Sequence, residues 1–171
     1  LRAMSVQPVG MPTLAENRFQ PVPADIPEGV RGVILASPGN PSGTMLGQAE
    51  LAALARATAA RGAALVSDEI YHGLSYGDRA VSALEVTDDV VVVNSFSKYF
   101  GMTGWRLGWL ILPEELLEPV RDWLGSPLRA EIAAATPQER VSQPTPVMPT
   151  PMRPKSPANW VTTLTTSMRA A

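Results

Sequence analysis

Cysteine is absent from the 171-residue sequence, and only one histidine is present. Disulfides, thiolate metal sites and cysteine nucleophiles are therefore excluded, and one histidine cannot build a multi-histidine metal centre. A charge excess of either sign is also missing, because 14 basic and 16 acidic side chains leave a net charge of -2. This balance excludes a basic nucleic-acid surface and gives no support for a patch that binds anionic membranes.

Long apolar runs are missing as well. No stretch approaches the roughly 20 apolar residues that a membrane span needs. No charged segment followed by an apolar core marks a secretion signal. Hydrophobic residues make up 45% of the chain and charged residues 18%, which is typical of a chain that folds around a core. We therefore expect a soluble, cytoplasmic protein that has no membrane or nucleic-acid partner.

The 17 prolines divide the chain into parts. Residues 31–125 hold four of them and also most of the periodic apolar pattern, whereas residues 126–171 hold eight. We place the folded part at residues 1–125. Residues 126–171 contain many helix and strand breakers, so we expect a proline-rich tail that is extended or disordered.

Within the middle part, apolar runs predict four buried strands, at residues 32–36, 63–66, 90–93 and 106–112. The third is the clearest, because four consecutive valines suit the interior of a sheet. Two helices are predicted, at residues 50–61 and 114–124. The first is rich in Ala and Leu and is closed by Gly62.

The alternation of buried strands with helices predicts a βαβ unit and a parallel sheet. The link between the third and fourth strands, residues 94–105, is different. It is too short for a typical helical crossover, so we expect the fourth strand to be antiparallel. The predicted fold class is α/β with a mixed sheet.

Polar residues follow the first three strands at the points where they end. Asn40 follows the first strand, Asp68 and Tyr71 follow the second, and Lys98 follows the third. Ligands of open α/β sheets bind beyond the carboxyl ends of the strands. We therefore expect these four side chains to lie on one edge of the sheet.

These residue types suit the parts of one cofactor. A lysine such as Lys98 can form a Schiff base with an aldehyde, and a carboxylate such as Asp68 can pair with a pyridinium nitrogen. Tyr71 and Asn40 can hydrogen-bond a phenolate oxygen.

A phosphate group would also find partners nearby. Arg106 lies eight residues after Lys98 and offers a forked set of donors for a phosphate. Ser95 and Ser97 add hydroxyl groups. Aldehyde, pyridine, phenolate and phosphate together indicate pyridoxal 5'-phosphate, and no metal is needed.

Three segments carry a resemblance to a known family: residues 40–44 (NPSGT), 67–71 (SDEIY) and 95–108 (SFSKYFGMTGWRLG). In this order and at these spacings they resemble the class I and II aminotransferases, which are fold-type I pyridoxal-phosphate enzymes of the aspartate aminotransferase superfamily. The resemblance covers roughly residues 1–125. It implies part of a large domain with three αβα layers and a mostly parallel sheet that has one antiparallel strand.

The resemblance also implies roles for the matching residues. Lys98 would hold the cofactor as a Schiff base and move the substrate proton, and Asp68 would keep the pyridine nitrogen protonated. Tyr71 is the third residue of the catalytic group. The implied cofactor-binding residues are Asn40, Asp68, Tyr71, Ser95, Ser97, Lys98 and Arg106. The reaction would transfer an amino group from an amino acid to a 2-oxo acid, and full-length relatives would be homodimers.

The chain also departs from the family pattern. It begins with Leu1, and the upstream segment that carries the glycine loop and the ring-stacking aromatic residue is not seen. From about Ser126 the resemblance stops, which leaves a frameshift product or a natural tail as two open explanations. We expect a fragment with little or no transaminase activity of its own.

Three alternatives stay open at this point. A carbon–sulfur lyase or a decarboxylase could use the same fold and cofactor, and a non-catalytic aminotransferase-like module could bind the cofactor as a sensor. The third alternative is a non-functional truncated product. His72 and Glu69 receive no chemical role from the sequence; we expect His72 to be a structural or surface residue and Glu69 to be structural.

Overall fold

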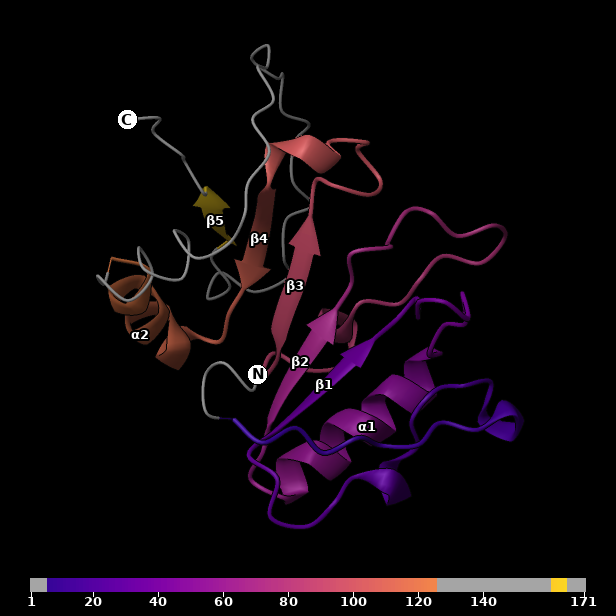
Figure 1. Ribbon diagram of the computed structural model, residues 1–171. Helices are drawn as coiled ribbons and strands as arrows, with labels where there is room; N and C mark the ends of the chain where they lie inside the picture. Colours follow the sequence, from indigo (N-terminus) through magenta and orange to yellow (C-terminus); the bar gives the residue numbers. More distant parts are fainter. Residues whose placement is uncertain (1–5, 126–160, 166–171) are drawn as a thin grey trace.

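The computed structural model describes residues 6–125 and 161–165. Helices and short 3₁₀ turns separate the strands along the chain, and the strands form one sheet (Figure 1). The elements are β1 (Gly32–Ala36), α1 (Gln48–Ala60), β2 (Ala64–Asp68), β3 (Val91–Ser95), β4 (Leu107–Ile111), α2 (Glu114–Gly125) and β5 (Val161–Thr165). Short 3₁₀ turns occur at η2 (Ala15–Asn17), η3 (Pro23–Asp25), η4 (Ala83–Glu85) and η5 (Thr103–Trp105).

The sheet is mixed and has the strand order β1-β2-β3-β4-β5. β1, β2 and β3 are parallel, whereas β4 runs antiparallel to β3. The predicted fold class, with its antiparallel fourth strand, is therefore confirmed. The link between β3 and β4 contains only η5, which is too short to carry the chain back for a parallel pairing.

β5 comes from the segment that the sequence predicted to be an extended or disordered tail. Residues 161–165 instead pair antiparallel with β4 over the whole length of that strand. The segment reads Val-Thr-Thr-Leu-Thr, and its β-branched Val and Thr residues are compatible with a strand. The rest of the predicted tail, residues 126–160 and 166–171, lies outside the described residues.

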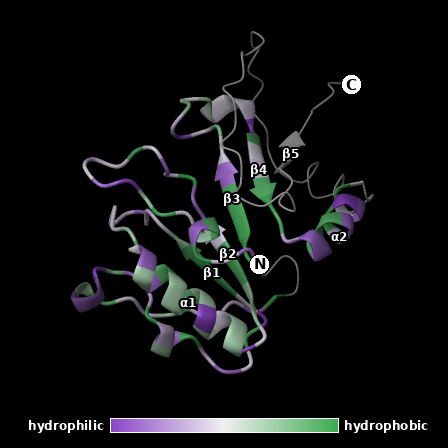
Figure 2. Cartoon of the chain, turned by 180° about the vertical axis from the view of Figure 1, so that it is seen from behind, coloured by the Kyte–Doolittle hydropathy of each residue, from purple (hydrophilic) through white to green (hydrophobic). Residues whose placement is uncertain are grey.

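The core lies between α1 and the β1–β2 side of the sheet. Burial alternates along β1, so that Val33 and Leu35 are buried with Leu51 and Leu54 of α1, whereas Ile34 is 54% exposed. Figure 2 shows the strands as largely hydrophobic and β3 as hydrophilic at its carboxyl end. The sheet therefore supplies an apolar body and a polar edge.

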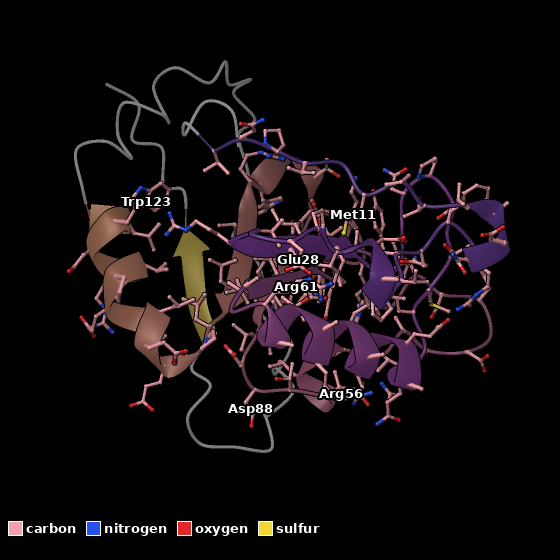
Figure 3. All side chains as sticks on the ribbon, turned by 90° about the horizontal axis from the view of Figure 1, so that it is seen from below. Met11, Glu28, Arg56, Arg61, Asp88 and Trp123 are labelled. Atoms are coloured by element: carbon pink, nitrogen blue, oxygen red, sulfur yellow. The ribbon has the colours of Figure 1, made fainter. Side chains whose placement is uncertain are left out.

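Hydrogen bonds and an ion pair fix both ends of α1. The helix begins at Gln48 rather than at the predicted Glu50, because Glu50 Oε2 accepts the backbone N–H of Gly47 (2.7 Å) and satisfies a donor at the helix start. Near the other end, Arg61 Nη2 lies 3.7 Å from Glu28 Oε1 (Figure 3). This pair ties the segment before β1 to the helix.

β3 and β4 pack closely at a glycine. Gly108 pairs with Ser95, and a Cβ atom placed on Gly108 would lie 2.7 Å from the carbonyl oxygen of Asn94. No side chain fits there without moving a strand. This contact fixes the base of the loop 96–106, which carries the predicted lysine.

Candidate functional site

The polar residues predicted to share one edge follow strands whose carboxyl ends are aligned. Asp68 pairs with Ala36 on one side and with Val93 on the other. Beyond the strands, Ser37 N donates to Asp68 O (3.2 Å), and Glu69 N donates to Val93 O (2.9 Å). The loops that follow β1, β2 and β3 therefore leave the sheet from a common edge, as the sequence predicted.

Asn40 and Tyr71 come together from two of these loops. Asn40 Nδ2 donates a hydrogen bond to Tyr71 Oη at 3.1 Å. The tyrosine hydroxyl still has its own proton, and the amide still has a second N–H, so the pair can donate twice to one ligand oxygen. Both residues border a pocket of about 450 Å³, whose lining also includes Pro41, Met45 and Leu74.

Lys98 reaches the same group from the loop after β3. Its Nζ lies 5.5 Å from the centroid of the Tyr71 ring, at the distance of a cation–π contact. The side chain is exposed, and within the described part of the chain it has no carboxylate partner. The structure therefore brings Asn40, Tyr71 and Lys98 together from three separate loops.

Tyr99, next to the lysine, joins the loop after β3 to the loop after β2. Its ring packs on Gly73, where an added Cβ atom would lie 2.5 Å from the ring and where φ is +87°. The same loop is anchored to β4 by Phe96, whose ring centroid lies 4.9 Å from that of Trp109. A side chain at position 73 would push the lysine-bearing loop away.

Two serine hydroxyls form a second polar group at the end of β3. Ser95 Oγ lies 2.8 Å from Ser97 Oγ and 3.1 Å from the carbonyl oxygen of Leu107, and it accepts the backbone N–H of Ser97 (3.0 Å). The contact between Ser95 and Leu107 places the hydroxyl group beside the backbone of the residue that follows Arg106. Arg106 itself is exposed and has a φ of 52°.

Asp68 and Arg106 are not joined to these groups by direct contacts. Asp68 Oδ1 accepts the backbone N–H of Ile70 (3.1 Å), and Arg106 Nη1 lies 3.5 Å from the carbonyl oxygen of Thr103. No hydrogen bond or ion pair links either residue to the other predicted site residues in the described part of the chain. Their place in the site rests on their position at the strand ends.

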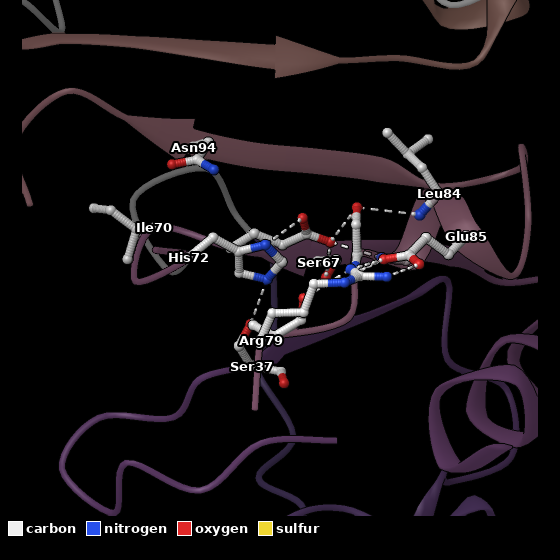
Figure 4. Close-up of polar contacts among 12 residues, drawn as sticks. Ser37, Ser67, Ile70, His72, Arg79, Leu84, Glu85 and Asn94 are labelled. Atoms are coloured by element: carbon white, nitrogen blue, oxygen red, sulfur yellow. Dashed lines mark hydrogen bonds and ion pairs between the residues drawn. The ribbon is translucent and has the colours of Figure 1, made fainter. Parts of the chain in front are cut away.

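Glu69 and His72 lie close to Tyr71 in the sequence, and neither was predicted to take part in the site. His72 Nε2 lies 3.0 Å from the carbonyl oxygen of Ser37, and Nδ1 lies 3.4 Å from Glu69 Oε2 (Figure 4). The signal available in the sequence was a second acidic residue directly after the strand, next to Asp68. Ser82 and Ala83, which bind Glu69, lie 13 and 14 residues later, and Ser37, which binds His72, lies 35 residues earlier, so no local pattern could identify these partners.

Two other kinds of site were sought among the described residues. Within residues 6–125 and 161–165, no cluster of three or more metal-ligating side chains occurs. No helix in this part of the chain has the length and apolar character needed to cross a membrane.

The family model of the class I and II aminotransferases matches residues 2–141, which is most of the chain. The chain belongs to this family. The match includes all three segments that carried the resemblance, and it continues past residue 125, where the sequence analysis placed the end of the family-like part.

Relatives of this aminotransferase chain agree with the family model. The valine–pyruvate aminotransferase of Mycobacterium tuberculosis is 42% identical over 146 residues, which cover 80% of this chain and 38% of that protein. The aspartate aminotransferase of Geobacillus stearothermophilus is 35% identical over 124 residues, covering 67% and 32%. The chain therefore spans about a third of the length of these relatives.

Solved aminotransferase structures show the same fold. A Silicibacter pomeroyi protein assigned to the aminotransferases superposes with a TM-score of 0.69 and 49% identity, over 78% of this chain and 38% of that one. The aspartate aminotransferase of Thermus thermophilus, solved with maleate, gives a TM-score of 0.59 at 36% identity, over 64% and 30%. The likeness covers part of one domain of these proteins.

Proposed function

We propose that residues 1–125 form part of the cofactor-binding domain of a pyridoxal-phosphate-dependent aminotransferase. The single observation that carries the proposal is the meeting of Asn40, Tyr71 and Lys98 at one edge of the sheet. It supplies an accessible amine beside two donors that can bind one oxygen. Family membership supports the proposal independently.

The donor set fits the groups of pyridoxal 5'-phosphate. Lys98 Nζ would hold the aldehyde as a Schiff base, and Asn40 and Tyr71 would donate to the ring oxygen. Asp68 would pair with the protonated ring nitrogen. Ser95, Ser97 and Arg106 would bind the phosphate, for which hydroxyl and guanidinium groups are suitable donors.

When bound, the cofactor supplies an electron-withdrawing ring that stabilises negative charge at the Cα atom of an amino acid. The chain's own contribution would be to orient and to move protons. Asp68 would keep a proton on the ring nitrogen, and Lys98 Nζ would accept the Cα proton and return it at a neighbouring carbon. The substrates would be an amino acid and a 2-oxo acid.

The choice of donor stays open between several amino acids. The two relatives described above act on valine with pyruvate and on aspartate, by their names. A carbon–sulfur lyase or decarboxylase on the same fold remains the second candidate, because the observations above concern the cofactor and not the substrate. The cytoplasmic location and the homodimeric state of full-length relatives also stay predictions.

The test uses the unusual scarcity of lysine. Lys98 and Lys155 are the only lysines in the sequence, so Lys155→Ala is a matched control for Lys98→Ala. We expect wild-type chain and Lys155→Ala to develop a visible absorbance band with pyridoxal phosphate, and borohydride to fix the label on the peptide that contains Lys98. Lys98→Ala should lack the band.

An equal band in the Lys98→Ala variant would contradict the proposal, as would labelling of the N-terminal amine or Lys155 instead. A separate assay of amino transfer by the chain itself should give little or no turnover. Appreciable turnover would overturn the expectation that the chain is a fragment with little activity.

A further inference from the structure

Glu69 is a buried acid that joins three parts of the chain. It is 3% exposed, and its Oε1 accepts hydrogen bonds from Ser67 Oγ (3.2 Å), Ser82 Oγ (3.1 Å) and Ala83 N (2.8 Å). Its second oxygen faces His72 Nδ1 at 3.4 Å. Three donors on one oxygen hold the carboxylate still, because each would be left unsatisfied if it moved.

His72 connects Glu69 to the loop after β1. Its Nε2 lies 3.0 Å from the carbonyl oxygen of Ser37. A carbonyl oxygen only accepts, so Nε2 bears a proton and donates it. Ser37 is itself held, because its Oγ accepts the backbone N–H of Leu46 (2.9 Å). A chain of contacts thus runs from Glu69 through His72 to Ser37.

This chain of contacts matters because the backbone ladder between β1 and β2 stops just before it. The last backbone hydrogen bond between the two segments runs from Ser37 N to Asp68 O. Beyond it, within the described residues, only two side-chain links join the segments: His72 to Ser37, and Asn40 to Tyr71. The first involves Ser37, the residue directly after β1, and the second involves Asn40, three residues later.

We propose that Glu69 and His72 are positioning residues that set the spacing of Asn40 and Tyr71. The inference rests on the proposed function in one respect: the two donors serve a common oxygen of the cofactor. Tyr71 lies between Glu69 and His72 in sequence, so fixing both neighbours fixes the backbone that carries the phenol. The link to Ser37 then fixes the backbone that leads to Asn40 three residues later.

Two substitutions of His72 distinguish its contact with Ser37 from its contact with Glu69. Gln has an amide nitrogen as far from Cβ as Nε2 of histidine, so His72→Gln can still donate to Ser37 O. Asn has its amide nitrogen at the distance of Nδ1, so His72→Asn keeps only the side facing Glu69. The proposal predicts that His72→Gln preserves the Asn40–Tyr71 hydrogen bond and that His72→Asn loosens it.

The first measurement needs no cofactor and uses the full chain. The sequence has four asparagines, so labelling asparagine with ¹⁵N gives four side-chain amide signals, and Tyr71→Phe identifies that of Asn40. His72→Asn adds a fifth side-chain amide signal, and in this variant the Asn40 signal should move toward its position in Tyr71→Phe, whereas in His72→Gln it should stay near the wild-type position. An unmoved signal in His72→Asn, or an equal shift in both variants, would overturn the proposal.

A second measurement covers the case in which His72→Asn does not fold. His72 is the only histidine, so ¹⁵N-histidine labels one ring. Coupling between two links is reciprocal, so Tyr71→Phe should speed the exchange of the Nε2 proton with water. Unchanged exchange in Tyr71→Phe would contradict the proposed coupling even without the histidine variants.

A third measurement adds pyridoxal phosphate. We expect His72→Asn to weaken its binding about tenfold and His72→Gln by less than about twofold, the size of one hydrogen bond. A wild-type chain that forms no Lys98-dependent band would count against the proposed function alone, because the two cofactor-free measurements would still decide the role of His72. Equal affinities of the two variants would count against positioning.

Discussion

The loops after β1 and β2 are joined by side-chain hydrogen bonds, whereas the loop after β3 is held by backbone hydrogen bonds of its own and by aromatic packing. We call the loops after β1 and β2 the first side and the loop after β3 the second side. On the first side, Asn40 donates to Tyr71, and His72 links Glu69 to Ser37. On the second side, backbone bonds close the turn from within, such as Met102 N to Phe96 O (3.1 Å) and Gly101 N to Lys98 O (3.0 Å).

The two sides also differ in charge. The acid of the first side, Glu69, is buried, and its Oε1 accepts three hydrogen bonds. The cations of the second side, Lys98 and Arg106, are exposed and have no acidic partner among the described residues. The first side is therefore assembled without a ligand, and the second side presents positive charge to an anionic one.

The largest loss of stability is expected when Glu69, the buried acid of the first side, is replaced. Glu69→Ala would leave the donors of Ser67, Ser82 and Ala83 without their acceptor, so we expect a loss of about 3 kcal/mol in the free energy of unfolding. Urea unfolding followed by circular dichroism measures it. The control is Glu118→Ala, whose ion pair with Arg121 is exposed and should contribute less than about 0.5 kcal/mol. Similar losses in the two variants would show that the buried hydrogen bonds contribute little.

The second side can be disrupted by a substitution at Gly108, where β3 and β4 carry the base of the loop. Gly108→Ala would place a methyl group 2.7 Å from the carbonyl oxygen of Asn94, which forces β3 and β4 apart. We expect a loss of about 2 kcal/mol in the free energy of unfolding, again from urea curves. Gly10→Ala is the control, because nothing lies within 4 Å of its added Cβ atom. A neutral Gly108→Ala would mean that the strands tolerate separation there.

Comparing a ligand with and without a phosphate group tests whether the exposed cation Arg106 binds an anion. If Arg106 binds the phosphate, Arg106→Ala should weaken binding of pyridoxal phosphate about tenfold, because a charged hydrogen bond is lost. Binding of pyridoxal, which lacks the phosphate, should not change. Titration of the visible band gives both affinities. Equal weakening for the two compounds would place Arg106 in the structure of the loop and not at the phosphate.

The smallest effect concerns the ion pair between Arg18 and Glu50, which lies in the first turn of α1. The hydrogen bond from Arg18, with a further one from Gly47, lowers the pKa of Glu50. A lowered pKa in the folded state means a contribution to stability that is present above the unfolded pKa and lost as pH falls through the folded one.

Glu50→Gln removes the charge and leaves an oxygen that can accept from Gly47. We expect a loss below about 0.5 kcal/mol at pH 7, because the pair is about half exposed and screened by solvent. In urea unfolding curves the difference from wild type should shrink as the pH falls below the ordinary glutamate pKa, and it should vanish below the lowered pKa of Glu50. A difference that persists in acid would assign the effect to the shape of the side chain.

The sequence was sufficient where local signals were strong. The apolar runs located β1 to β4 to within two residues, and the short link after β3 predicted the direction of β4. The shared edge followed from strand direction alone. The meeting of Asn40 with Tyr71 was therefore expected in kind, although its 3.1 Å hydrogen bond was not.

The rest depends on contacts between distant residues. Glu69 binds groups that lie 13 and 14 residues later in the chain, and His72 binds a carbonyl oxygen 35 residues earlier. Backbone atoms accept or donate at most positions, so such partners leave no signature in residue type. β5 was missed for a related reason: its pairing with β4 depends on the fold and not on a strong local pattern.

The outward face of β1 has a practical consequence for every binding experiment described above. Ile34 is 54% exposed, and Gly32 and Ala36 on the same face of β1 are exposed as well, so the folded chain presents apolar sheet surface. Environment-sensitive dyes bind such surface and fluoresce. A dye-based thermal shift assay would therefore start from a bright baseline and understate stabilisation by a cofactor, whereas intrinsic tryptophan fluorescence or circular dichroism would report the melting itself.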